Sequence, residues 1–194
     1  AQLEDLNGEL AELARTDPLT QLGNRLRLRE DLHTLHARAE RHGRPYSIAM
    51  VDLDAFKLYN DTYGHPQGDT ALQRIAAVLT TDLRAEDAAY RYGGEEFIVV
   101  LADENLSGAV KATDRLRIAV ENLAIPHRRN NPPGILTISA GVATFTPHTS
   151  VTADSVLEQA DRALYVAKHQ GRNRVAAPQP ARVPSKVAQE IDPS

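Results

Sequence analysis

The sequence predicts an α/β fold of the α+β sandwich type, in which helices cover both faces of a central mixed β-sheet. Three observations lead to this class. Short β-branched and aromatic runs alternate with amphipathic stretches in the order βααββαβα. The chain has 194 residues, of which 42% are hydrophobic and 25% charged, enough for one sizeable core. No apolar run approaches the roughly 18 residues of a membrane helix, and no signal peptide is visible.

Five stretches have the apolar spacing of helices. The first has clear ends, because Asn24 is a good N-cap, and Gly43 is a natural stop after His42. Gly171 ends the last one in the same way. The expected helices span residues 25–42, 55–62, 67–83, 107–123 and 153–169.

Five shorter runs are typical of β-strands. Two of them flank Gly93 and Gly94, and because glycine reaches positive φ without steric cost, this pair predicts a hairpin. The expected strands span residues 46–51, 88–92, 97–101, 135–144 and 174–176.

The chain divides into a linker helix over residues 1–15, a folded domain over 16–177 and a tail over 178–194. In the linker, the spacing of Leu3, Leu6, Leu10 and Leu13 is that of a heptad. It fits either a coiled-coil stub or a single amphipathic helix packed on the domain. The tail is rich in Pro, Ala, Ser and charge, so we expect disorder. Because the chain begins with Ala1, we interpret it as a fragment.

Composition excludes several classes of chemistry. The absence of cysteine rules out disulfides, thiol catalysis and cysteine metal sites, and it is compatible with the cytoplasm, where we expect the protein. A net charge of −4 provides no global basic field for nucleic acid, so phosphate chemistry needs a local site. The sequence has no phosphate loop, dinucleotide fingerprint, nucleophile elbow or His-Glu-x-x-His motif.

Acidic residues mark a candidate metal site. Glu95 and Glu96 follow the glycine turn, where adjacent carboxylates repel each other unless a cation is near. Asp52 and Asp54 follow the strand over 46–51, although Asp54 is equally suited to cap the next helix. If the hairpin lies beside that strand, Asp52 meets the turn, and the Leu53 carbonyl adds an oxygen. Mg²⁺ favours such a site, which suits phosphoryl or nucleotidyl transfer.

A base-recognition pair lies between these acids. Asn60 offers a donor and an acceptor, and Asp69 offers acceptors, which together match the edge of guanine. Adenine would leave the aspartate unpaired, at a cost of about 1–3 kcal/mol. Taken alone, both residues also fit loop and cap positions. Gly64 and Gly68 are interpreted as turn residues.

Lys168 and Arg172 lie four residues apart where the last helix closes. They form either a phosphate clamp or a solvated helix end favoured by the helix dipole. Gly171 is expected to end the helix before Arg172.

Together these segments resemble the GGDEF family of diguanylate cyclases, in the variant with Gly-Gly-Glu-Glu-Phe. The resemblance covers about residues 14–175 and rests on the blocks 17–25, 52–69, 91–97, 160–168 and 171–173. It implies a palm-like nucleotidyl cyclase fold and the condensation of two GTP into cyclic di-GMP and two pyrophosphates.

The resemblance also implies residue roles. The catalytic and metal-binding residues, for Mg²⁺ or Mn²⁺, would be Asp52, Leu53 through its carbonyl, Glu95 and Glu96. The GTP-binding residues would be Phe56, Lys57, Asn60, Asp69, Gly94, Lys168 and Arg172. Because each domain of the family holds one GTP, a homodimer is implied, which favours dimerisation through the leucine stripe. An upstream sensory domain is also expected.

A second site follows from the family's inhibitory Arg-x-x-Asp motif, which Arg84 and Asp87 match. It implies binding of the product and product inhibition, with Arg115 contributing from the next helix. The same pattern is common on protein surfaces. The alternative function is a catalytically silent domain that senses GTP or cyclic di-GMP, but the intact turn motif favours the enzyme. A cyclase or polymerase of another nucleotide is a third interpretation.

Overall fold

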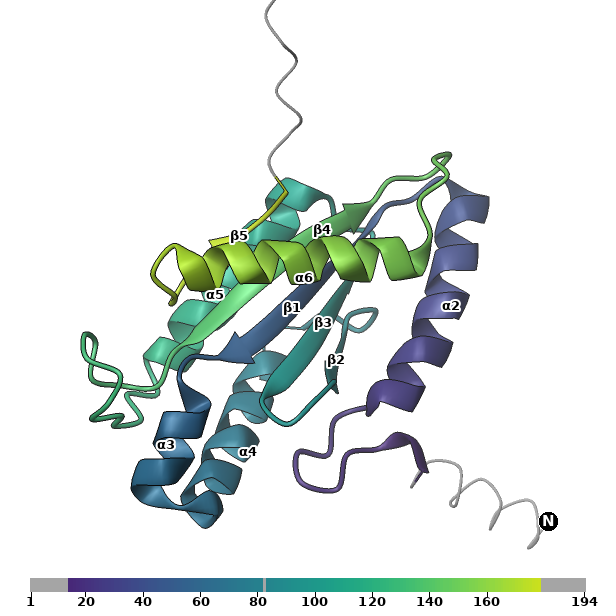
Figure 1. Cartoon of the computed structure of the whole chain (residues 1–194). Helices are drawn as coiled ribbons and strands as arrows, with labels where there is room; N and C mark the ends of the chain where they lie inside the picture. The colour runs from purple at the N-terminus through teal and green to yellow at the C-terminus, as the bar shows by residue number, and fades with distance from the viewer. Residues whose placement is uncertain (1–13, 82, 179–194) are drawn as a thin grey trace, which may run out of the picture.

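A computed structural model describes residues 14–81 and 83–178 and shows a five-stranded sheet with helices on both faces (Figure 1). The helices are α2 (Arg25–His42), α3 (Phe56–Tyr63), α4 (His65–Thr81), α5 (Leu106–Glu121) and α6 (Ala153–His169). The strands are β1 (Tyr46–Leu53), β2 (Ala88–Arg91), β3 (Glu96–Ala102), β4 (Ile138–Phe145) and β5 (Val175–Ala176). The predicted fold class and element order are confirmed.

The sheet is mixed. Its strand order is β2-β3-β1-β4-β5, with antiparallel pairs except for the parallel pair of β4 and β5. The predicted hairpin is confirmed, since β2 pairs with β3, and β3 lies directly beside β1. The central position of β1 places the end of this strand next to both the hairpin turn and β4.

Two hydrophobic cores lie on the two faces of the sheet because side chains alternate along β1. Ile48 and Met50 pack in the core with α2 and α6. Ala49 and Val51 pack in the other core with α3, α4 and α5. Figure 1 shows α6 crossing one face of the sheet and α5 lying behind it.

The residues that predicted where helices and strands begin and end were reliable, although several of these ends are shifted by one to three residues. The Asn24 side chain accepts from the backbone N–H groups of Leu26 and Arg27, and Gly43 has φ of 66°, so both predicted ends of α2 are confirmed. The structure extends β1 to Leu53. It starts β4 at Ile138 rather than residue 135, because the segment before it pairs elsewhere: the Leu136 N–H donates to the Ile125 carbonyl.

The leucine stripe over residues 3–13 and the tail from residue 179 lie outside the described residues. The division of the chain at residues 15 and 178 therefore stays a prediction. Within residues 14–81 and 83–178, no helix has the length and apolar character needed to cross a membrane.

Gly141 in β4 is a packing requirement. A Cβ atom there would collide with the backbone of α6, at the Ala160 carbonyl oxygen and the Leu164 nitrogen. Gly141→Ala should therefore lower the free energy of unfolding by about 2–3 kcal/mol, because a packed helix has to move away from the sheet. Urea unfolding measures this change. Gly94→Ala is the control, since a Cβ there meets nothing within 4 Å, and equal midpoints for the two variants would contradict the prediction.

Candidate active site

The sheet register brings the predicted acidic residues together. Asp52 on β1 pairs with Glu96 on β3, and the Leu53 N–H donates to the Glu95 carbonyl at 3.3 Å. Residues more than forty positions apart in the sequence therefore meet at one end of the sheet. The predicted juxtaposition of Asp52 with the glycine turn is confirmed.

Asp52 is buried, and its Oδ1 lies 2.8 Å from the Lys168 Nζ. Burial raises the pKa of Asp52, Lys168 lowers it in part, and the charges of Glu96 and Asp54 raise it again, so the pKa lies above its ordinary value. Burial, followed by the charge of Asp52, likewise raises the pKa of Glu95. The carboxylates thus crowd more negative charge together than Lys168 neutralises.

This donor set fits a hard divalent cation. Mg²⁺ generally takes one or two protein carboxylates and completes its octahedron with water and substrate phosphates. In the described part of the chain, no three Asp, Glu or His side chains form a ready-made metal cage. The partial set of Asp52, Glu95 and Glu96 matches the few carboxylates that a cation shared with a nucleotide needs, and the crowding of these carboxylates favours a positive charge between them.

A half-buried ion pair between Arg91 and Asp17 supports the turn. The Arg91 Nη2 donates to the Gly94 carbonyl at 2.8 Å, while its Nη1 lies 3.1 Å from Asp17 Oδ1. Burial alone would raise the pKa of Asp17, but hydrogen bonds from Thr20 and Arg91 outweigh it and hold the pKa below its ordinary value. The sequence alone indicated no role for Asp17 or Arg91. The one feature of the sequence that pointed to this pair was the position of Arg91 just before the glycine turn.

The two glycines of the turn differ in their surroundings. A Cβ at Gly93 would lie 2.5 Å from Glu96 Oε2, whereas a Cβ at Gly94 would meet no protein atom within 4 Å. Gly94 is exposed, so its backbone is open to a ligand. This agrees with the close approach expected at that position.

Asn60 projects toward α4 from α3. Its Oδ1 is buried and has no hydrogen-bond partner among the described residues, which is costly unless a donor arrives. The interpretation of Gly68 as a turn residue was wrong: it is buried inside α4, where a Cβ would collide with Asn60 Oδ1 and lie 3.2 Å from the Phe56 ring. The exposed Asp69 follows it on the same helix. Lys57 is also exposed.

Asp54 is not a helix cap. The N-cap of α3 is Ala55, and Asp54 is instead a buried carboxylate at the junction of three segments. It accepts hydrogen bonds from Thr137 Oγ1 at 2.7 Å, Ser139 Oγ at 2.6 Å and the Asn173 N–H at 3.0 Å. It therefore ties β1 and β4 to the segment after α6.

The residues of the predicted phosphate clamp differ in their contacts. α6 ends at His169, as the position of Gly171 predicted, and Arg172 lies in a left-handed conformation with φ of 61°. The Arg172 side chain is exposed and forms no ion pair among the described residues. Lys168 forms an ion pair with Asp52, so one of the two predicted phosphate-binding side chains already contacts a carboxylate of the protein.

His127 is a further residue that sequence analysis missed. It is fully buried, its Nε2 lies 3.0 Å from the Ala55 carbonyl oxygen, and its ring contacts Tyr59 edge-on at 5.3 Å. It therefore fixes the start of α3, the helix that carries Asn60. No pattern around this histidine indicated that position.

Arg84, Asp87 and Arg115 line a separate pocket of about 180 Å³, which none of the acidic-site residues line. Arg84 reaches Glu104 at 3.5 Å, and Asp87 accepts from the backbone N–H groups of Arg84 and Ala102. The structure thus brings the three predicted inhibitory-site residues to one cavity. Asp87 is partly engaged in holding its own loop.

The mixed sheet, with an acidic glycine hairpin beside a buried aspartate, defines the palm-like class of nucleotidyl cyclase domains. The family model for the diguanylate cyclase GGDEF domain matches residues 14–174, and the chain belongs to this family.

Several proteins are similar to this chain. Diguanylate cyclase A of Treponema denticola is 39% identical over 175 residues, which are 87% of this chain and 46% of that protein. The crystal structure of the coiled coil and GGDEF domain of DgcB from Caulobacter crescentus in complex with c-di-GMP is 34% identical, with a TM-score of 0.83, covering 91% of this chain and 92% of that one. The active GGEEF domain of a diguanylate cyclase from Vibrio cholerae is 32% identical, with a TM-score of 0.71, covering 83% and 100%.

Proposed function

We propose that this protein condenses two GTP molecules into cyclic di-GMP and two pyrophosphates, as a metal-dependent homodimer. The observation that carries the proposal is the register of β1 and β3, which sets Asp52 beside the intact Gly93–Phe97 turn. A silent sensor needs no such cluster of carboxylates at the end of the sheet. The active Vibrio cholerae domain with a GGEEF motif supports the enzyme over the sensor.

The reaction is an attack of the 3′-hydroxyl of one GTP on the α-phosphate of the other. A new oxygen–phosphorus bond forms as the bond to pyrophosphate breaks, and the reciprocal attack by the 3′-hydroxyl of the second GTP closes the ring and releases the second pyrophosphate. A bound Mg²⁺ or Mn²⁺ would make the hydroxyl more acidic and offset charge on the phosphoryl oxygens. Asp52, Glu95, Glu96 and the Leu53 carbonyl would hold that cation, with Glu96 as the principal catalytic carboxylate.

The remaining residues would bind and orient GTP. Asn60 and Asp69 would bond the guanine edge. The buried Asn60 oxygen, which has no partner in the described part of the chain, supports this assignment because a guanine amino group would supply the missing donor. Phe56 and Lys57 would contribute from the same helix. The exposed backbone of Gly94 would lie against the nucleotide, and the side chains of Lys168 and Arg172 would bind the triphosphate.

Catalysis requires two copies, because each site binds one GTP and the two must face each other. The rate should therefore be second order in protein unless a dimer forms first. The coiled coil of the DgcB structure supports the proposal that the leucine stripe of this chain brings two copies together. We place this reaction in the cytoplasm.

The function is tested by incubating the chain with GTP and Mg²⁺, or Mn²⁺, over a series of protein concentrations and separating the nucleotides by chromatography. We expect cyclic di-GMP, with a rate per protein that rises with concentration. If the protein binds GTP but forms no cyclic di-GMP at the highest protein concentration, it is instead a catalytically silent sensor domain. Product formation from ATP at an equal rate would contradict the base assignment.

Arg84→Ala should weaken product inhibition. The pocket shared by Arg84, Asp87 and Arg115 suits guanine, since arginine bonds its O6 and N7, while aspartate accepts from its N–H groups. We expect the inhibitory concentration of cyclic di-GMP to rise about tenfold or more, with little change in initial rate, because one such pair contributes about 1–3 kcal/mol. Titration of initial rates with cyclic di-GMP measures this. Arg162→Ala, on the exposed surface of α6, is the control, and unchanged inhibition in Arg84→Ala would remove the site.

A further inference from the structure

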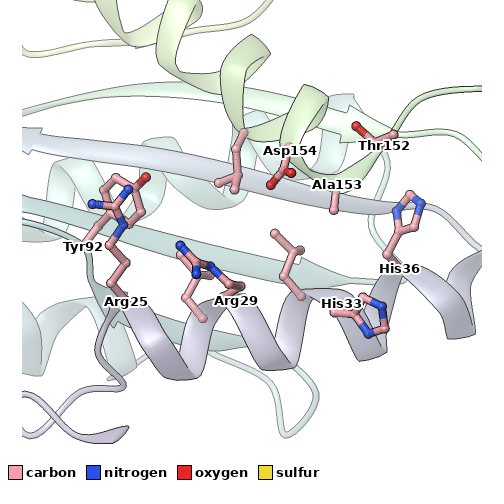
Figure 2. A pocket seen from close by; sticks show the side chains of 11 residues that line it. Arg25, Arg29, His33, His36, Tyr92, Thr152, Ala153 and Asp154 are labelled. Atoms are coloured by element: carbon pink, nitrogen blue, oxygen red, sulfur yellow. The ribbon is translucent and has the colours of Figure 1, made fainter.

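A cavity of about 500 Å³ lies between α2 and the first turn of α6, apart from both sites described above (Figure 2). Its lining residues come from α2, the hairpin and the start of α6: Arg25, Leu28, Arg29, Leu32, His33, His36, Tyr92, Thr152, Ala153, Asp154 and Leu157. Ligand pockets typically measure about 300–1,000 Å³, so a small organic molecule fits.

The mouth of this cavity carries unneutralised positive charge. Figure 2 shows Arg25 and Arg29 on α2 facing the start of α6, with Arg25 beside Tyr92. The Arg25 guanidinium lies 4.7 Å from the centre of the Tyr92 ring, and neither arginine forms an ion pair among the described residues. Asp154 is the lining carboxylate, and the two histidines add no negative charge. An anion is therefore favoured at this mouth.

The floor is apolar. Leu28 and Leu32 are buried in the α2 and α6 core, and Leu157 packs against the same core. His36 is held in the wall by its contact with the Tyr46 hydroxyl at 3.0 Å. A flat ring set on the leucines would gain from burial, at about 25 cal/mol per Å² of apolar surface removed from water.

We propose that this cavity binds a small amphipathic anion in which one flat apolar ring carries one phosphate group. The phosphate lies at Arg25 and Arg29, whose planar guanidinium groups bond phosphate oxygens in pairs. The ring lies on Leu28, Leu32 and Leu157. The proposal rests on this cavity and does not depend on cyclase activity.

The test uses phenyl phosphate as the probe, because it joins the two groups and carries no guanine to attract it to the nucleotide sites. Isothermal titration of the full chain should show one saturable site that binds phenyl phosphate at least tenfold more tightly than inorganic phosphate or phenol. Arg29→Ala should weaken binding at least tenfold, and Arg25→Ala should weaken it as well. Arg162→Ala should not change it.

The proposal would be overturned by no saturable binding, by equal affinity of Arg29→Ala and the unmodified chain, or by equal affinity for inorganic phosphate. Competition by a non-hydrolysable GTP analogue would also overturn it, since that result would place the probe in the nucleotide site. Both arginines are exposed, so thermal unfolding should show that the variants keep the fold.

Discussion

Glu96→Gln is expected to lower the rate of cyclic di-GMP formation about a hundred- to a thousandfold, the usual loss when one preorganised electrostatic contact to the transition state is removed. The substitution keeps the shape of the side chain and removes its charge. Glu96 pairs with Asp52 across the sheet, so the change weakens the cation site at its centre. The fold should persist, because the backbone of Glu96 still accepts from the Tyr92 and Gly93 N–H groups that close the turn.

Chromatography of the nucleotides at matched protein concentrations measures the loss, and thermal unfolding checks the fold. Glu158→Gln is the matched control, since Glu158 lies on the exposed side of α6, and it should keep full activity. Wild-type rates for Glu96→Gln in folded protein would remove Glu96 from the catalytic set. Such a result would shift the catalytic role to Asp52 and Glu95.

Local signals predicted the fold well. Asn24 and Gly43 end α2 as expected because capping depends on a few neighbouring residues. The glycine turn predicted a hairpin, and the apolar run before Asp52 predicted a buried strand. From these two elements the meeting of Asp52 with the turn followed, since a hairpin next to β1 leaves few alternatives. The core of the candidate site was thus predictable.

The parts that were missed depend on contacts between distant segments. Asp54 had the local pattern of a cap, but its partners Thr137 and Asn173 lie 83 and 119 residues further along the chain. Gly68 had the local pattern of a turn, but it is required by the Asn60 side chain that packs against it from α3. Such roles follow from tertiary packing, which a single sequence does not display.

The contacts of Asp54 give the largest expected effect on stability. Two hydroxyls and one backbone N–H converge on this buried carboxylate, and its own N–H donates to the Thr137 carbonyl. Asp54→Ala leaves two buried hydroxyls and one part-buried backbone N–H without their acceptor, and a buried donor costs about 1–3 kcal/mol when unsatisfied. Because these costs are not additive, we expect the free energy of unfolding to fall by about 3–5 kcal/mol.

Urea unfolding measures the loss, with Asp61→Ala on the exposed side of α3 as the control, which should stay within about 0.5 kcal/mol. If Asp54→Ala does not fold, Ser139→Ala removes one of the three bonds and should cost about 1–3 kcal/mol, because that bond is made to a charged group. Stability equal to that of the control in either variant would show that the carboxylate is not a structural anchor.

The same contact has a consequence for substrate binding. Asp54 Oδ2 accepts from the Asn173 N–H, and Asn173 directly follows Arg172, which we assign to the triphosphate. A weaker anchor should therefore let Arg172 move and raise the KM for GTP more than it lowers kcat. Ser139→Ala is the variant for this measurement, since it keeps most of the anchor. If Ser139→Ala instead lowers kcat and leaves KM unchanged, Asp54 acts on the carboxylates of the acidic site, through the neighbouring Asp52.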